Sequence, residues 1–142
     1  MDLVFQKGRY DEETLKDILN ILYEDDLPHH DDIVENYFKK KYLIYFASAY
    51  FGSQPFAYCI VKEPTIRPET ATVVHSKWRN KGIATKLRNY VLEQREFFGN
   101  IVYSSCELSN PASFKSILKS DYHVFDLTKD GYIQFTKILP YK

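Results

Sequence analysis

The sequence predicts a mixed α/β (α+β) fold, and three observations lead to this prediction. The 142 residues match the usual size of one domain and leave little room for a second core. The 12 Tyr and 10 Phe are spread over strand-like runs, which favours a sheet-rich core. Segments with helical and with strand-like spacing of apolar residues alternate along the chain. We therefore expect a single domain over residues 1–142, with a central mixed, mostly antiparallel sheet flanked by helices.

The first sixty residues predict a strand, two helices and a hairpin. Residues 2–6 alternate weakly between apolar and polar side chains, as in a short strand. Acidic residues open the segment 11–24, where apolar side chains recur at helical spacing and predict a first helix. The stretch "DDLPHHDD" contains a proline and predicts a loop, after which residues 33–38 recover helical spacing. Residues 42–50 and 55–62 predict two strands joined across Gly52-Ser53-Gln54, a connection of hairpin length.

The rest of the chain predicts two more helices among four strands. "TATVV" (residues 70–74) predicts a strand, and the amphipathic segment 82–97 predicts a long helix that Gly99-Asn100 ends. Residues 101–108 predict a strand, and Asn110-Pro111 is typical of a helix start. Residues 122–126 and 132–139 predict a final antiparallel pair across Lys129-Asp130-Gly131. The expected order is β-α-α-β-β-β-α-β-α-β-β.

Charge and composition argue against several classes of function. The 19 basic and 19 acidic residues cancel, so no global field attracts nucleic acid, and we expect no nucleic-acid partner. The amino terminus lacks a basic start with an apolar stretch, and nowhere do about 18 apolar residues run together. We therefore expect a cytoplasmic protein without a membrane partner. Cys59 and Cys106 lie in apolar strand-like runs, which favours reduced core residues, with a single bridge between them as the alternative.

The strongest local signal is the cationic junction between the strand at 70–74 and the helix that follows. A helix start carries unpaired N–H groups and a partial positive charge, so a junction kept small by Gly82 and Ala84 can bind phosphate oxygens. The spacing excludes the phosphate loop of ATPases and the dinucleotide fingerprint, because both need further glycines. The alternative is that Arg79, Lys81 and Lys86 form only a solvated helix-start face.

The segment "VHSKWRNKGIA" (residues 74–84) resembles the acetyl-CoA-binding motif of the GNAT superfamily of N-acetyltransferases. Arg79–Ala84 match the pattern (Arg/Gln)-x-x-Gly-x-(Gly/Ala), in which loop amides hold the pyrophosphate. The sequence departs from the common form at Ser76, Trp78, Asn80 and Ala84, which stand for proline, tyrosine, glycine and glycine. A second, weaker likeness lies in "NPASFKSILKSDYHVF", so the two signatures together span residues 70–125.

The resemblance implies that acetyl-CoA is the cosubstrate and that no metal is needed. It implies backbone contacts to the pyrophosphate from the loop, pairing of the pantetheine arm along residues 70–75, and an asparagine near the far end of that arm. Asn110 is also a good helix cap whatever its function. The implied cofactor-binding residues are Val73, Val74, His75, Arg79, Asn80, Lys81, Gly82, Ile83, Ala84, Thr85, Asn110 and Ser113.

The resemblance also implies direct acetyl transfer to a primary amine in a ternary complex, which needs a base and an acid on opposite sides of the reacting carbon. Glu69 and Glu107 are the candidate bases, and a water chain is the alternative to either. The family's usual acid is a tyrosine seven residues after the asparagine, but this position is Ile117. Tyr122 and Tyr103 are the candidate substitutes, and otherwise solvent protonates the thiolate.

The acceptor is expected to be a small-molecule or peptide amine, and a cationic one. The chain's strongest charge imbalance consists of six carboxylates, with His29 and His30 among them: Glu24, Asp25, Asp26, Asp31, Asp32 and Glu35. In the family, the loop that joins the first two helices commonly borders the acceptor site. The alternative is that these acids only cap the second helix. A further alternative is a CoA-binding sensor or interaction module with little catalytic activity. We expect a monomer or a homodimer.

Overall fold

The computed structural model of the chain describes residues 2–22 and 27–141, and only the backbone of residues 27–29. The elements follow in the order that the sequence predicts, with one short 3-10 helix, η1, in addition. They are β1 (Val4–Lys7), α1 (Glu12–Leu22), α2 (Leu27–Phe38), β2 (Tyr42–Ser48), β3 (Ala57–Lys62), β4 (Glu69–Val74), η1 (Ser76–Trp78), α3 (Ile83–Gln94), β5 (Ile101–Glu107), α4 (Pro111–Lys119), β6 (His123–Leu127) and β7 (Tyr132–Ile138).

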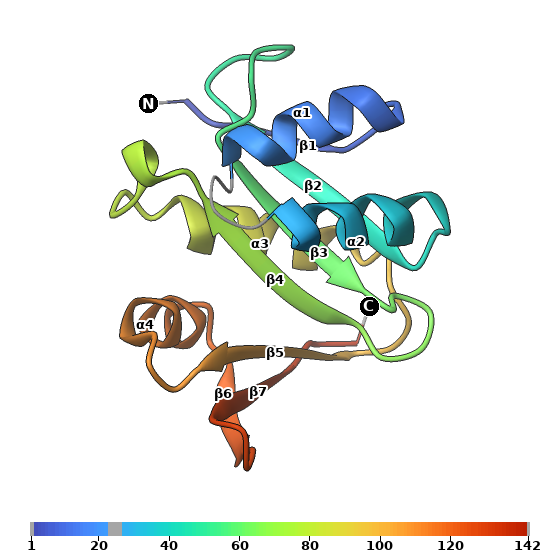
Figure 1. Cartoon of the computed structure of the whole chain (residues 1–142). Coiled ribbons are helices and arrows are strands. Elements are labelled where there is room, and N and C mark those ends of the chain that lie inside the picture. Colours follow the sequence, from blue (N-terminus) through green and yellow to red (C-terminus); the bar gives the residue numbers. More distant parts are fainter. Residues whose placement is uncertain (1, 23–26, 142) are drawn as a thin grey trace.

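The strands form one seven-stranded sheet in the order β1-β2-β3-β4-β5-β7-β6. Neighbouring strands run antiparallel throughout, except that β4 and β5 are parallel. Figure 1 shows α1 and α2 in front of the strands β1 to β4 and α3 behind them, while α4 lies beside β5. The expected mixed, mostly antiparallel sheet flanked by helices is confirmed. Within the described residues no helix is long and apolar enough to cross a membrane.

The start of α2 corrects the sequence-based prediction. The stretch 25–32 was expected to be a loop because it contains Pro28, yet α2 begins at Leu27 and includes this proline. Proline is tolerated in the first turn of a helix, because its missing N–H would have no intrahelical partner there. His29, His30, Asp31 and Asp32 therefore belong to a helix and not to a loop.

The end of α3 is a second correction. The helix ends at Gln94, well before the expected Gly99-Asn100, because Arg95 adopts a left-handed conformation with φ of 52°. The Arg95 side chain donates hydrogen bonds to Asn100 Oδ1, at 2.9 Å, and to the carbonyl of Pro140. Asn100 lies just before β5 and Pro140 just after β7, so these contacts hold Arg95 outside the helix.

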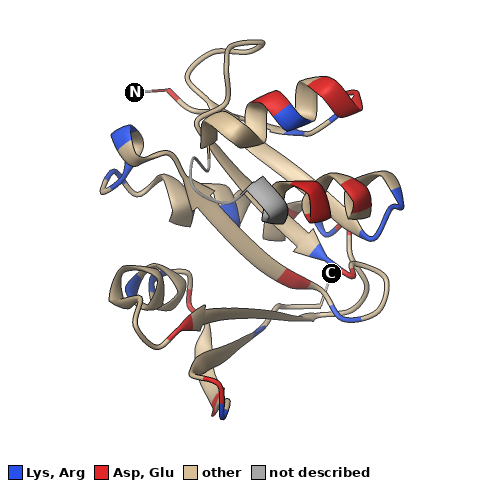
Figure 2. Ribbon diagram, viewed as in Figure 1, with Lys and Arg blue, Asp and Glu red and all other residues tan. Residues whose placement is uncertain are grey.

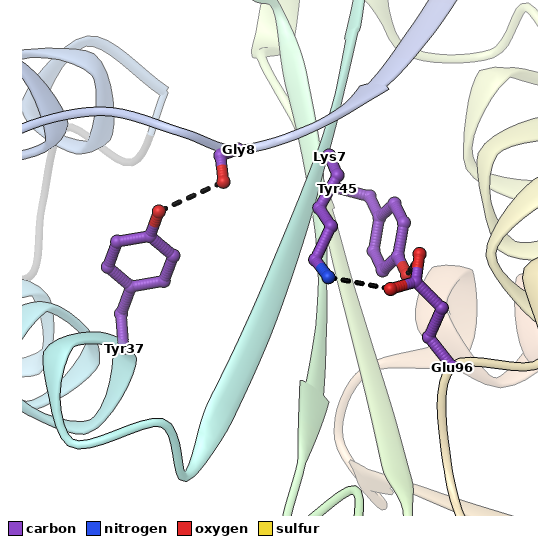
Figure 3. A network of polar contacts seen from close by, with 5 residues as sticks. All are labelled: Lys7, Gly8, Tyr37, Tyr45 and Glu96. Atoms are coloured by element: carbon purple, nitrogen blue, oxygen red, sulfur yellow. Dashed lines mark hydrogen bonds and ion pairs between the residues drawn. The ribbon is translucent and has the colours of Figure 1, made fainter.

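Glu96, which follows Arg95, connects β1 to the end of α3 through an ion pair and a hydrogen bond. Lys7 Nζ donates to Glu96 Oε2 at 2.6 Å, and the buried hydroxyl of Tyr45 donates to Glu96 Oε1 at 2.8 Å (Figure 3). On the other side of the sheet, the Tyr37 hydroxyl donates to the carbonyl of Gly8 at 2.9 Å (Figure 3). Side chains thus secure a short edge strand whose ladder with β2 is only four residues long.

The buried apolar side chains form two clusters, which we call the first core and the second core. The first core joins α1, α2, β2, β3 and α3 and contains Cys59. The second core joins β5, α4 and β7 with Leu92 of α3 and contains Cys106. Both thiols are buried and free, so the alternative of a bridge is wrong. The residues of the second core are Leu92, Val102, Cys106, Ile117, Tyr122, Ile133, Phe135 and Leu139.

Candidate functional site

The two parallel strands β4 and β5 diverge from each other within the sheet. β4 pairs with β3 along all six of its residues, Glu69 to Val74. In these two fully described strands, one Cα pair alone joins β4 to β5, between Glu69 and Tyr103. Parallel strands in one sheet normally continue to exchange regularly spaced hydrogen bonds. The carboxyl-terminal half of β4 therefore presents an edge that β5 does not cover.

The loop that follows β4 ends in an open helix start. Asn80 and Gly82 both adopt left-handed conformations, with φ of 63° and 74°. Gly82 caps α3 without a side-chain hydrogen bond, and the first backbone hydrogen bond into the helix is from Lys86 N to Gly82 O. No acceptor among the described residues receives a hydrogen bond from the N–H groups of residues 83–85, as expected for a first helical turn. A Cβ atom on Gly82 would meet open space, so an incoming group can approach this backbone.

Three side chains hold the loop in place and make it cationic. Arg79 Nε donates to the carbonyl of Val74 at 3.1 Å, which ties the loop back to the end of β4. Trp78 stacks on Phe56, with ring centroids 4.2 Å apart, and Lys81 Nζ lies 5.7 Å above the Trp78 ring. Figure 2 shows the basic residues on this loop, at the left of the view between β4 and α3. The charge and the free N–H groups make the start of α3 favourable for an anion.

The other predicted cofactor residues lie beside this loop on β4 and α3, or at the start of α4. Val73 and Val74 are half-buried at the end of β4, and the His75 side chain accepts a hydrogen bond from Lys77 N at 3.2 Å. Ile83 is buried, so only its backbone faces the helix start. Asn110 caps α4 and accepts from Ser113 N at 3.1 Å, which gives both residues a structural role independent of any ligand.

Glu69, a candidate base, lies where β4 and β5 part. Ser105 Oγ donates to Glu69 Oε1 at 3.1 Å, across the junction. Tyr103, the register partner of Glu69, is half-buried, with the Arg67 guanidinium 4.0 Å from its ring centroid. Glu107, the other candidate base, is exposed at the end of β5, and the Tyr132 hydroxyl donates to it at 3.4 Å. The structure thus brings Glu69 and Tyr103 together and leaves Glu107 at the far end of β5.

Tyr122, a candidate acid, is buried beneath the junction. Its side chain is 1% exposed, and its hydroxyl shares a hydrogen bond of 2.7 Å with Thr70 Oγ1. Burial raises the pKa of this hydroxyl above its ordinary value, with the hydrogen bond to Thr70 acting against that rise. Ile117, which stands where the family's tyrosine is expected, is buried in the second core. Tyr122 therefore has the position of a structural tyrosine, while Tyr103 is the more accessible of the two.

The predicted acceptor residues are only partly described. Asp25 and Asp26 lie outside the described residues, and so does the side chain of His29. His30 is 2% exposed, and its Nδ1 lies 2.9 Å from Asn20 Oδ1 of α1, so it does not face solvent as a rim residue must. Asp31 and Asp32 are exposed on α2. Figure 2 shows acidic residues on both α1 and α2.

Two threonines of β4 are part of this site, and sequence reasoning missed both. Thr70 is buried, and besides its bond to Tyr122 its carbonyl accepts from Ser104 Oγ at 2.8 Å. Thr72 is half-buried just beyond the point where β5 departs, and its buried hydroxyl lies beside the thiol of Cys59, its register partner on β3. Strand alternation places both threonines on one face of β4, but it does not indicate which strand departs.

No model of a known protein family and no curated protein sequence matches the chain. Solved structures do match it along nearly all of its length. A Desulfovibrio desulfuricans protein assigned to the GNAT family of acetyltransferases has a TM-score of 0.78 at 10% identity, over 96% of this chain and 99% of its own. The chain has the GNAT fold. The ribosomal-protein-alanine N-acetyltransferase of Brucella melitensis matches this GNAT fold with a TM-score of 0.71 at 18% identity, over 96% and 99% of the two chains.

A dodecameric spermidine N-acetyltransferase from Vibrio cholerae also shares the GNAT fold, with a TM-score of 0.72 at 12% identity, over 96% of this chain and 93% of its own. All three neighbours are described as acetyltransferases, and the two whose descriptions name an acceptor differ in it. At these identities the likeness concerns the GNAT fold itself, and the chemistry of the chain must be argued from its own residues.

Proposed function

We propose that the chain is a GNAT superfamily N-acetyltransferase that moves the acetyl group of acetyl-CoA directly to a primary amine in a ternary complex. One observation carries the proposal: the uncovered edge of β4 leads into the start of α3. The first-turn N–H groups of this helix have no acceptor among the described residues, and cationic side chains lie beside them. Acetyl-CoA has a pyrophosphate that suits such a helix start and a peptide-like arm that suits a strand edge. The fold shared with acetyltransferases supports the same reading.

The described residues fit this cosubstrate. The N–H groups of residues 83–85 and the open space at Gly82 suit the pyrophosphate, with Arg79 and Lys81 beside it. The backbone edge of β4 that β5 leaves uncovered suits the amides of the pantetheine arm. Bound acetyl-CoA supplies a thioester whose carbonyl carbon accepts an amine.

The residues of the chain contribute orientation and proton transfer. A β4 amide near Val74 is placed to polarise a carbonyl, since β5 leaves this edge of the strand uncovered. Glu69, held by Ser105, lies five residues before Val74 on β4, or roughly 16 Å along the strand. It therefore accepts the proton of the attacking amine through a chain of water molecules. The nitrogen–carbon bond forms as the carbon–sulfur bond breaks, and the proton on the thiol comes from Tyr103 or from solvent. Alignment of the two reactants supplies much of the acceleration.

Thermal unfolding with acetyl-CoA tests the proposal. Ligand at a hundredfold excess over its dissociation constant stabilises the folded state by about 2.7 kcal/mol, so the melting temperature rises by several degrees. Gly82→Glu abolishes the rise, because it places an anion where the pyrophosphate is held. Gly99→Glu is the matched control, since Gly99 also has a positive φ, of 80°, and also faces open space. An unchanged melting temperature of the parent protein at millimolar acetyl-CoA rejects the proposal.

A second candidate function is a CoA-binding module with little transfer activity. The specific observation in its favour is that Tyr122, one of the two candidate acids, is buried and hydrogen-bonded to Thr70. Mass spectrometry of amines incubated with acetyl-CoA distinguishes the two functions. Binding of acetyl-CoA without an acetylated product from a broad amine panel selects the second.

The acceptor belongs to the proposal as a primary amine, expected to be cationic. The spermidine N-acetyltransferase among the neighbours acts on a polyamine, which agrees with an amine acceptor here. The exposed Asp31 and Asp32 provide negative charge on α2. Replacing both with asparagine should raise KM for cationic amines at low salt and leave acetyl-CoA unaffected. If the parent protein and this variant have the same KM for cationic amines, α2 is not part of the acceptor site.

A further inference from the structure

A buried arginine lies between the two cores. Arg88 points inward from α3 and is 4% exposed. Its Nη1 donates to Ser120 Oγ at 2.6 Å and to the carbonyl of Ser116 at 3.1 Å, both in or next to α4. Its Nε is buried without a partner, and it forms no ion pair with any Asp or Glu in the part of the chain that the structure describes. Burial lowers the pKa of this guanidinium.

Such a side chain is costly to keep. A buried charge without a counter-ion loses much of its hydration, and a buried donor without an acceptor adds to the loss. A methionine of similar length would fill the same space at lower cost, since buried ionic groups are often replaced by apolar ones without loss of stability. Packing alone therefore does not account for an arginine at position 88.

The contacts of Arg88 join the two halves of the molecule where the sheet parts. α3 contributes mainly to the first core and α4 to the second. On the sheet side of the same seam, Thr70 bonds to Tyr122 and Ser104, again across the two cores. Ser116 and Ser120 lie four residues apart, so the planar guanidinium contacts successive turns at the end of α4. These directional bonds fix where α4 lies relative to α3.

We infer that Arg88 is a positioning residue for acetyl-CoA: it holds α4 at the distance from α3 that lets the pantetheine arm lie between β4 and β5. This inference rests on the proposed function. The helix start that suits the pyrophosphate is on α3, and Asn110, which the family places near the end of the arm, begins α4. Any shift between the two helices therefore changes both ends of the ligand site together.

Three variants test the inference. Arg88→Met removes the directional bonds, and Ser120→Ala removes one acceptor with little change of volume. Arg95→Met is the matched control, because Arg95 follows the same helix and bonds to Asn100 and Pro140 instead of α4. Three quantities are measured for each variant: hydrogen exchange of the α4 amides without ligand, the dissociation constant of acetyl-CoA by calorimetry, and the urea midpoint of unfolding.

Arg88→Met is expected to keep or raise the urea midpoint, to speed exchange in α4 at least tenfold, and to weaken acetyl-CoA binding at least tenfold. Ser120→Ala changes exchange and binding in the same direction by a smaller factor, and adding it to Arg88→Met causes no further loss. Arg95→Met leaves both unchanged. A purely structural role predicts a lower urea midpoint with unchanged affinity in the folded variants, and that result overturns the inference.

A failure of the positioning role and a failure of the proposed function give different results. If the parent protein binds acetyl-CoA and both Arg88→Met and Ser120→Ala bind it as tightly, the positioning role is wrong and the proposed function stands. If the parent protein does not bind acetyl-CoA, the proposed function is wrong and the positioning role for this ligand falls with it.

Discussion

Glu69 shows what the structure adds to a residue that sequence reasoning could only rank. Glu69 lies ten residues before Arg79, and this spacing ranked it only slightly above Glu107 as the candidate base. The fold places Glu69 at the last point of contact between β4 and β5, with Ser105 donating to it, whereas Glu107 lies exposed at the other end of β5. Position relative to the parting strands therefore favours Glu69.

Glu69→Gln is expected to lower kcat by about 10²- to 10⁴-fold, which is the usual contribution of general acid–base catalysis. The KM for acetyl-CoA should change little, because the amide keeps the size of the side chain. Steady-state kinetics with the best amine of the panel measure both constants. Glu107→Gln is the matched control, and an equal loss of kcat in the two variants contradicts the assignment.

At the scale of elements, the sequence predicted every α-helix and strand in order, but not the 3-10 helix η1 and not all of the element ends. Hydrophobic spacing is local, so it identifies a helix such as α1 without tertiary information. The end of α3 depends on Arg95 and Glu96, whose partners Asn100, Pro140 and Lys7 lie on other segments. The start of α2 was missed for a local reason, since a proline inside a first turn was taken for a breaker.

The residues of the candidate site also divide into those that local sequence could predict and those that depend on distant contacts. The loop between β4 and α3 was predictable because its function depends on consecutive residues, from Arg79 to Thr85. The contact of Tyr122 with Thr70, 52 positions earlier in the chain, was not, because no periodicity connects residues so far apart. Arg88 gave no signal either, since a lone arginine on an amphipathic helix is ordinarily read as solvated.

The link between β1 and α3 predicts a pH dependence of stability. Lys7, which donates to it, holds the pKa of Glu96 below the ordinary value, against a smaller opposing effect of burial. A carboxyl with a lowered folded-state pKa stabilises the fold above its unfolded-state pKa and loses this contribution as the pH falls through the folded-state value. Glu96→Gln should therefore lower the free energy of unfolding at pH 7 by at most about 1 kcal/mol, and less in acid.

Urea unfolding of the parent protein and of Glu96→Gln between neutral pH and acid measures this difference. Glu93→Gln is the matched control, because Glu93 is an exposed carboxylate three residues earlier, in the last turn of α3. A difference between the parent protein and Glu96→Gln that stays constant as the pH falls would mean that the ion pair does not contribute.

At the scale of the whole molecule, the two cores meet along a boundary that is largely polar. Thr70, Ser104, Tyr122 and Arg88 form hydrogen bonds across it, while Phe97 packs against both cores. Polar contacts contribute less net free energy than apolar burial of similar extent. We therefore expect the half that contains β5, α4, β6 and β7 to unfold locally before the rest of the molecule.

The two cysteines report on the two cores separately, because Cys59 lies in the first and Cys106 in the second. Burial raises the pKa of both thiols, so neither should react with a thiol reagent in the native protein at neutral pH. At urea concentrations below the unfolding midpoint, we expect Cys106 to be labelled several-fold faster than Cys59. Peptide mapping by mass spectrometry measures the two rates, and equal rates would show a single cooperative unit.

Trp78 gives the molecule an optical property that follows from its place in the loop. It is the chain's one tryptophan, and it stacks on Phe56 while Lys81 lies above its ring. All tryptophan emission therefore originates beside the start of α3, in contact with the segment that an anionic ligand would reorder. Intrinsic fluorescence, excited at the red edge where tyrosine does not absorb, thus reports on that segment alone, without an attached dye or an added label.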